Sequence, residues 1–176
     1  MKIAITGTPG TGKTTCSKKV ETGYEIVHLN EIIKEKKLYS SFDEKRQTLV
    51  ADIEAIDEEF KHRSDIVIDS HISHLLDVDK VIVLRCHPNE LKQRLKNREY
   101  EDGVNIEMSV EENINAEALD VILIESINLH GKEKVHEIDG TGEKPEAVAR
   151  EIERIIAGKS GPKVGLVSFI EYLFEN

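Results

Sequence analysis

The sequence predicts an α/β fold in which helices cover both faces of a parallel β-sheet. Short apolar runs alternate with longer helical patterns along the 176 residues, which is typical of strand–helix–strand units. The first apolar run ends in a glycine-rich turn that opens a helix, and the run at residues 66–68 ends in an aspartate. This order of strand, loop and helix predicts one nucleotide-binding domain over residues 1–176.

The first half of the chain contains three expected strands and three expected helices. Gly23 ends the first helix, because glycine readily adopts the left-handed conformation found at helix ends. The run at residues 66–68 is unbroken and apolar, as expected for a buried strand. In order, the elements are a strand at residues 2–6, a helix at 13–22, a strand at 24–29, a helix at 30–37, a helix at 52–62 and a strand at 66–68.

The second half continues this alternation. Pro88 marks a helix start, where its missing N–H group costs nothing. Ser109 and Glu112 have the spacing of a capping box, which predicts a helix that runs to about residue 127. The other expected elements are a strand at residues 81–84, a strand at 135–138, a helix that ends at Gly158 and a short helix within 166–173.

Two polar stretches, residues 38–46 and 98–108, interrupt the pattern. Surface loops are the simplest interpretation of both. The alternative is a pair of flaps that close over a substrate, because binding segments are often placed on such connections. The residues alone leave both interpretations open.

The strongest motif is the eight-residue run Gly-Thr-Pro-Gly-Thr-Gly-Lys-Thr at residues 7–14, which matches GxxxxGK[ST] in full. Its glycines allow a tight turn in which successive N–H groups point at one anion, and the helix that follows adds its positive end. Lys13 is expected to reach the β- and γ-phosphates of ATP, and the Thr14 hydroxyl to bind Mg²⁺. We assign nucleotide binding to Gly7, Pro9, Gly10, Thr11, Gly12, Lys13, Thr14 and Thr15.

Asp69 ends the buried strand at residues 66–68, where a phosphate-loop enzyme needs a carboxylate for the hydrated Mg²⁺. Asp77 and Asp79 precede a strand and fit this role less well. A simple turn residue is the alternative for Asp69. His71 lies two residues further on, in a loop expected to open on the nucleotide crevice, where it could orient water or the attacking oxygen. Most single histidines have no catalytic role, and none is assigned to His74.

Arg94 and Arg98 are four residues apart and share one face of the expected helix. Planar guanidinium groups stabilise the charge that develops on a transferring phosphoryl group. The alternative is a solvated helix face paired with nearby glutamates, which is the preferred interpretation of Lys92 and Lys96.

Composition limits the classes of partner. The chain has 24 basic and 34 acidic residues, a net charge of −10, which argues against a broad nucleic-acid surface and is compatible with a basic protein partner. The two cysteines, Cys16 and Cys86, form no zinc pattern. No run approaches the ~18 apolar residues of a membrane span, and no signal peptide is recognised. We expect a cytoplasmic monomer.

Four segments together carry a resemblance to a known family. They are the phosphate loop GTPGTGKTT, Asp69-Ser70-His71, Gln93-Arg94-Leu95-Lys96-Asn97-Arg98 and Glu112-Asn113-Ile114-Asn115-Ala116-Glu117. Over residues 1–158 the chain resembles the archaeal and eukaryotic nuclear-type adenylate kinases. In eukaryotes this family includes the coilin-interacting nuclear ATPase, which is also a factor in small ribosomal subunit maturation.

The resemblance implies a nucleoside-monophosphate-kinase fold with a five-stranded parallel sheet, an AMP-binding flap at about residues 30–64 and a lid at about 98–110. It implies phosphate transfer from ATP to AMP with Mg²⁺, together with ATPase activity. Catalytic roles then fall on Lys13, Asp69, His71 and Arg98, and His71 is linked to hydrolysis. Arg94 and Arg98 match arginines that bind nucleotide at the start of the lid. Gly140 lies in the expected adenine-contacting loop.

Two alternative functions remain open. One is an ATP-driven assembly factor that binds a basic small-subunit ribosomal protein and has little kinase activity. The other is a kinase for a different small acceptor, because a phosphate loop does not identify the acceptor. A GTPase is disfavoured, since the chain has no Asn-Lys-x-Asp motif. The chain also departs from the family at Arg98-Glu99-Tyr100, where the family usually has glycine in the middle, and Arg46 matches an AMP-contacting arginine only loosely.

Overall fold

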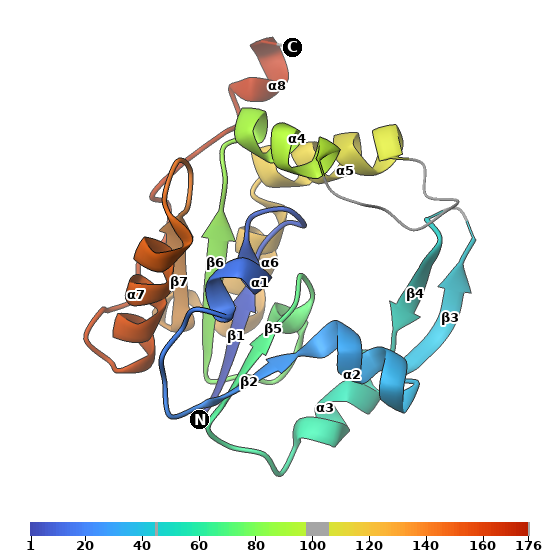
Figure 1. Ribbon diagram of the computed structural model, residues 1–176, viewed down its shortest axis with the longest axis vertical. Helices are drawn as coiled ribbons and strands as arrows, with labels where there is room; N and C mark the ends of the chain where they lie inside the picture. Colours follow the sequence, from blue (N-terminus) through green and yellow to red (C-terminus); the bar gives the residue numbers. More distant parts are fainter. Residues whose placement is uncertain (45, 98–105, 176) are drawn as a thin grey trace.

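The computed structural model describes residues 1–44, 46–97 and 106–175. The main sheet is parallel and has five strands in the order β2-β5-β1-β6-β7 (Figure 1). This confirms the predicted α/β fold. The five strands are β1 (Lys2–Thr6), β2 (Glu25–His28), β5 (Ile66–Asp69), β6 (Lys80–Arg85) and β7 (Val135–Asp139).

The strand register brings polar residues together at one edge of the sheet. β1 pairs with β5 from Lys2 opposite Ile66 to Ile5 opposite Asp69. On the other side of β5, His28 at the end of β2 lies opposite Asp69. Because parallel strands share their carboxyl ends, the loop that follows β1 and the residues that follow β5 meet there.

Side chains alternate between the two faces of the sheet, and each face has its own apolar cluster. Ile3 and Ile5 of β1 pack with α1 (Lys13–Ser17) and α7 (Pro145–Ile156). Ala4 faces the opposite way and packs with α2 (Leu29–Lys36), α3 (Ile53–Phe60) and α6 (Val121–His130). All three of these β1 side chains are 0% exposed, so β1 is a fixed base for the loop that follows it.

A third apolar cluster joins α4 (Pro88–Lys96) to α5 (Ile106–Ala118). These two helices lie across the carboxyl end of the sheet in Figure 1. Two short 3₁₀ helices, η1 (Ser73–Leu75) and η2 (Lys132–Lys134), complete the connections. Among the described residues, no helix is both long and apolar enough to cross a bilayer.

The first polar stretch forms an antiparallel hairpin, so the surface-loop interpretation of residues 38–46 is wrong. The hairpin consists of β3 (Tyr39–Asp43) and β4 (Thr48–Ala51), with Phe42 opposite Leu49. It stands apart from the main sheet in Figure 1. At its tip, the Arg46 guanidinium donates to both carboxylate oxygens of Glu112 on α5, at 3.2 and 3.0 Å.

The predicted helix bounds were wrong at three places. The first helix ends at Ser17 rather than at residue 22. The helix predicted from the capping box begins earlier, so Ser109 lies inside α5, and Asp120 divides α5 from α6 with a left-handed φ of 56°. The short helix expected within 166–173 is replaced by α8 (Tyr172–Glu175), which begins near the end of that range and extends beyond it. Most of the second polar stretch, including the expected lid residue Arg98, lies outside the described residues.

Candidate active site

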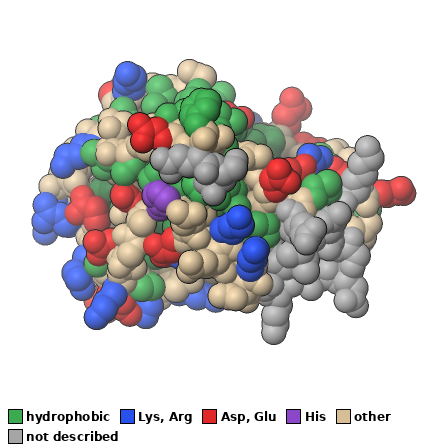
Figure 2. All heavy atoms as spheres, turned by 90° about the horizontal axis from the view of Figure 1, so that it is seen from above, with side chains coloured by type: hydrophobic (Ala, Val, Ile, Leu, Met, Phe, Trp, Pro, Cys, Tyr) green, Lys and Arg blue, Asp and Glu red, His purple; other side chains and the backbone are tan. Residues whose placement is uncertain are grey.

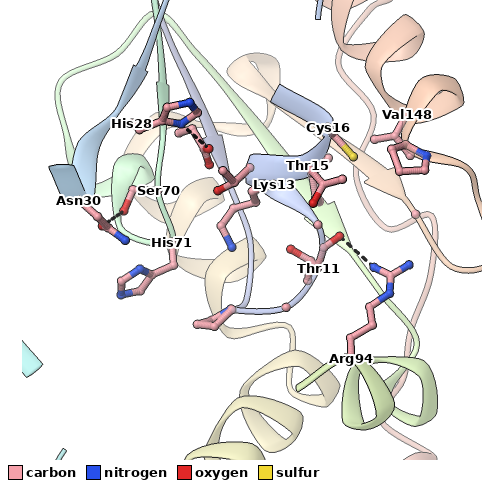
Figure 3. A pocket seen from close by; sticks show the side chains of 18 of the residues that line it. Thr11, Lys13, Thr15, Cys16, His28, Asn30, Ser70, His71, Arg94 and Val148 are labelled. Carbon is pink, nitrogen blue, oxygen red and sulfur yellow. Dashed lines mark hydrogen bonds and ion pairs between the residues drawn. The ribbon is translucent and has the colours of Figure 1, made fainter. Parts of the chain in front are cut away.

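A cavity of about 870 Å³ lies at the carboxyl edge of the sheet (Figure 3). It extends from the phosphate loop past Asp69 to Asn30 and Glu31 of α2 and to Thr48 of the hairpin. Most of the predicted site residues line it. They are Pro9, Gly10, Thr11, Gly12, Lys13, Thr14, Thr15, Asp69, His71, Arg94 and Gly140.

Three glycines give the phosphate loop its shape. Gly7, Gly10 and Gly12 have φ values of 138°, 95° and 97°, a region that side chains rarely tolerate. At Gly7 an added Cβ would also lie 2.3 Å from the carbonyl oxygen of Leu84. Gly7 is not among the residues that line the cavity, and it serves the loop through its backbone conformation.

The Lys13 side chain is held inside the loop. Its ammonium group donates to the carbonyl oxygens of Gly7 at 2.8 Å and Thr8 at 3.0 Å, and the residue is only 8% exposed. The Thr11 hydroxyl donates to the same Thr8 carbonyl at 2.9 Å. The loop therefore concentrates positive charge and N–H groups where an anion of a nucleotide would bind.

Asp69 is buried, and its two carboxylate oxygens have different surroundings. Oδ2 accepts from the Ser17 hydroxyl at 2.9 Å and lies 3.1 Å from Nδ1 of His28. Oδ1 is buried and has no hydrogen-bond partner among the described residues. An unpartnered buried acceptor is costly, so its position beside the cavity suggests that it serves a bound group.

Mg²⁺ fits this arrangement. The ion usually keeps several waters and takes one or two carboxylates together with substrate phosphates. Asp69 would supply the carboxylate, and Thr14, an exposed residue with a hydroxyl, lines the same cavity. The described residues contain no group of three His, Cys, Asp or Glu side chains suited to a metal.

Sequence reasoning missed His28 and Ser17, the two residues that hold Asp69. They lie far from Asp69 in the chain, and no local motif contains them. The register between β2 and β5 brings His28 to Asp69, and α1 brings Ser17. Only the order of the parallel strands could have revealed the histidine.

His71 is exposed and follows β5 on the cavity wall. Figure 3 shows it on the opposite side of Lys13 from Arg94. Its backbone carbonyl accepts from the Thr6 hydroxyl at 3.2 Å. Nearby, the Ser70 hydroxyl donates to Oδ1 of Asn30 at 3.1 Å, which ties α2 to the same loop.

Arg94 contacts the phosphate loop directly. Its Nη1 donates to the carbonyl oxygen of Thr11 at 3.2 Å, and its Nη2 pairs with Glu90.

The two cysteines have raised pKa values. Cys16 is buried, and burial raises the pKa of its thiol. Burial also raises the pKa of Cys86, to about 12, so neither cysteine supplies a ready nucleophile near neutral pH.

The turn after β7 is also fixed by its neighbours. The Gly140 N–H donates to the carbonyl oxygen of Arg85 at 3.0 Å. The Thr141 hydroxyl donates to Asp139 at 2.6 Å and accepts from the His87 N–H at 2.8 Å. This turn places Gly140 on the cavity wall.

Together, the parallel sheet and the glycine loop with its lysine define a P-loop NTPase fold of the kinase type. Residues 3–120 match a family described as an AAA domain. The chain is 46% identical over 173 residues to a Natronomonas pharaonis protein named "Putative adenylate kinase", covering 98% of this chain and 100% of that protein. A Methanocaldococcus jannaschii protein of the same name is 42% identical, with 99% and 96% covered. The chain belongs to this archaeal kinase family.

Solved structures support the fold. A shikimate kinase from Bacteroides thetaiotaomicron superposes with a TM-score of 0.61 at 17% sequence identity, covering 89% of this chain and 98% of that one. At this identity the likeness concerns the fold alone.

Proposed function

We propose that this nucleoside monophosphate kinase is an adenylate kinase, which transfers the γ-phosphate of ATP to AMP. The observation that carries the proposal is the shape of the site: one cavity of about 870 Å³ continues from the phosphate loop to α2 and the hairpin. Its volume lies in the upper range for small-molecule sites and suits two ligands placed end to end. Relatives at 46% and 42% identity carry the adenylate kinase name.

The roles of the residues follow from their places. Backbone N–H groups of the loop and the Lys13 ammonium bind the β- and γ-phosphates of ATP, and Arg94 adds positive charge on the α4 side. Mg²⁺, when bound, neutralises charge on the phosphate oxygens. Asp69 and Thr14 hold its coordination sphere, while Ser17 and His28 fix the Asp69 carboxylate. The acceptor lies between α2 and the hairpin, whose closure excludes water.

His71 supports a second activity, the hydrolysis of ATP. It is exposed on the cavity wall, so it can orient a water when the acceptor is absent. We extend this to a role in small ribosomal subunit maturation, in which hydrolysis releases a basic ribosomal protein. The net charge of −10 supports such a partner. On the face that Figure 2 displays, acidic and basic side chains are intermixed. Both activities are proposed for a cytoplasmic monomer.

Nucleotide separation tests the kinase proposal. The protein is incubated with ATP and Mg²⁺, with and without AMP, and the products are separated by ion-exchange chromatography. Transfer consumes AMP and yields two ADP for each ATP, whereas hydrolysis leaves AMP intact. Equal ADP yields with AMP untouched would contradict the proposal. CMP, UMP and GMP in place of AMP test for another acceptor, and Lys13→Ala controls for a contaminating kinase.

The partner proposal needs a separate experiment. Immobilised protein is exposed to purified small-subunit ribosomal proteins with ADP, with ATP, or with a non-hydrolysable ATP analogue. A basic protein that is retained with the analogue and released during hydrolysis supports the assembly role. Absence of nucleotide-dependent retention rules out that role and leaves the kinase assignment unaffected.

A further inference from the structure

A buried ionic network lies beneath the phosphate loop. Arg85 at the end of β6, Glu117 on α5 and Glu137 on β7 are 1%, 3% and 4% exposed. Arg85 donates from Nε to Glu117 at 2.8 Å and from Nη1 to Glu137 at 2.8 Å. Burial works against the Arg85 charge, but Glu117 and Asp120 outweigh it and raise its pKa. All three side chains are thus fully engaged.

One end of this network is the phosphate loop itself. The hydroxyl of Thr8, the second residue of the loop, donates to Oε2 of Glu117. Thr8 is 2% exposed. Its carbonyl oxygen accepts from the Lys13 ammonium and from the Thr11 hydroxyl. Glu117 therefore fixes Thr8, whose carbonyl oxygen accepts a hydrogen bond from the phosphate-binding Lys13.

The other end is the chain that follows α7. The N–H group of Leu166 donates to Oε2 of Glu137 at 2.7 Å. The ring of Phe169 covers the Arg85 guanidinium, whose Cζ lies 5.3 Å from the ring centroid. Phe169 is 8% exposed, whereas its neighbour Ile170 is 39% exposed. A continuous set of contacts thus runs from residues 166–169 through Glu137, Arg85 and Glu117 to Thr8.

Stability alone is a weak explanation for this network. Buried ion pairs often contribute no more to stability than apolar side chains of the same size, because their desolvation is costly. The arrangement instead gives the loop a defined shape, because hydrogen bonds to charged groups are stronger than hydrogen bonds between neutral groups.

We propose that Glu117 is a positioning residue for ATP binding: it sets the phosphate loop through Thr8, and residues 166–169 hold it in place through Glu137 and Arg85. The proposal rests on nucleotide binding at the loop and needs no particular acceptor. A molecule that displaces residues 166–169 would weaken ATP binding, and ATP would in turn favour the docked segment.

The loop end is tested by Mg²⁺–ATP affinity, measured with a fluorescent ATP analogue. Thr8→Val keeps the shape of the side chain and removes the donor, so the dissociation constant should rise roughly ten-fold, as for other bonds to a charged group. Thr8→Ser keeps a hydroxyl and should recover most of the affinity. Equal affinity in Thr8→Val and wild type overturns the role of Glu117.

The distal end is tested with a matched pair of variants. Phe169→Ala should raise the dissociation constant for Mg²⁺–ATP by about three- to ten-fold, while Ile170→Ala leaves it unchanged. Phe169→Leu is the fallback if the alanine variant does not fold. Affinity for AMP should stay constant in all of them. A lower melting temperature with unchanged ATP affinity would show that residues 166–169 have only a structural role, and it would overturn the proposal.

The outcomes separate this inference from the proposed function. Wild-type protein that binds Mg²⁺–ATP but leaves AMP intact contradicts the adenylate kinase assignment, and the Thr8 and Phe169 comparisons still decide the positioning role. Wild-type protein that transfers phosphate to AMP, with variants of equal ATP affinity, contradicts the positioning role alone.

Discussion

Asp69 combines two tasks in one side chain. One oxygen is held by Ser17 and His28, and the other is buried without a partner among the described residues. Ser17 and His28 therefore fix the orientation of the carboxylate before a ligand binds. Because the side chain is already ordered, binding loses less conformational entropy.

Asp69→Asn is expected to lower kcat by roughly 100-fold, because the amide lacks the negative charge that we propose to hold the coordination sphere of Mg²⁺. The Mg²⁺ concentration needed for half-maximal rate should rise at the same time. Initial rates over a Mg²⁺ series measure both effects. Asp77→Asn is the control, since its side chain is 88% exposed and distant from the cavity wall. An unchanged Mg²⁺ requirement in Asp69→Asn would contradict the assignment.

His71→Ala is expected to separate hydrolysis from binding. The imidazole lies on the cavity wall but outside the phosphate loop, so removing it should slow ATP hydrolysis by about ten-fold or more while the ATP dissociation constant changes little. Phosphate release without AMP measures the first quantity, and equilibrium binding the second. His62→Ala, an exposed histidine on the surface, serves as the control. Hydrolysis at the wild-type rate would refute the role of His71.

At the scale of elements, the hairpin β3–β4 meets α5 through the side chains of Arg46 and Glu112. The paired contact between Arg46 and Glu112 joins two elements that are otherwise separate in the chain. Both side chains are exposed, at 56% and 46%, so the pair is screened by salt and adds little to stability. The contribution of this pair is to position the tip of the hairpin against α5.

Arg46→Ala should therefore leave the melting temperature nearly unchanged and raise KM for the acceptor. Added salt should raise the wild-type KM for AMP towards the variant value, because ions screen the pair. Steady-state kinetics over a salt series provide the measurement. Lys61→Ala breaks another exposed pair, with Glu58 on α3, and should change neither quantity. A salt-independent wild-type KM would show that the pair does not position the hairpin.

The elements also show which features a sequence can reveal. The central strands β1, β5 and β6 were predictable because their apolar runs are buried on both faces. The phosphate loop and Asp69 were predictable because their patterns are local. The break at Asp120 was missed because an aspartate does not by itself predict a left-handed residue between two helices. Glu117 was recognised only as part of a resemblance, since its bond to Thr8 joins residues 109 positions apart.

For the whole molecule, acid sensitivity is expected from two buried histidines, His74 and His136, which are 2% and 3% exposed. Burial lowers the pKa of both below the ordinary value of 6.5, and Lys80 lowers that of His136 further. Below this value the unfolded chain binds more protons than the folded one. The free energy of unfolding should therefore fall as the pH drops from about 6.5 towards 5, and these groups add no pH dependence above that window.

Melting temperatures measured from pH 8 to pH 5 check this expectation. His136→Leu removes one of the two groups and should flatten the decline on the acid side. His62→Leu, at an exposed position, should leave the slope as it is. A decline of the same steepness in His136→Leu would show that His136 is not one of its sources.

The chain after α7 has a further consequence for the sheet. β7 is the last strand in the order, and its outer side would present unpaired backbone groups. Lys163 pairs with His136 there as a parallel bridge, and its carbonyl oxygen accepts the Glu137 N–H at 2.8 Å. An uncovered border of this kind is a template on which other chains can add. By pairing with β7 at this position, Lys163 occupies part of the edge on which another chain could add.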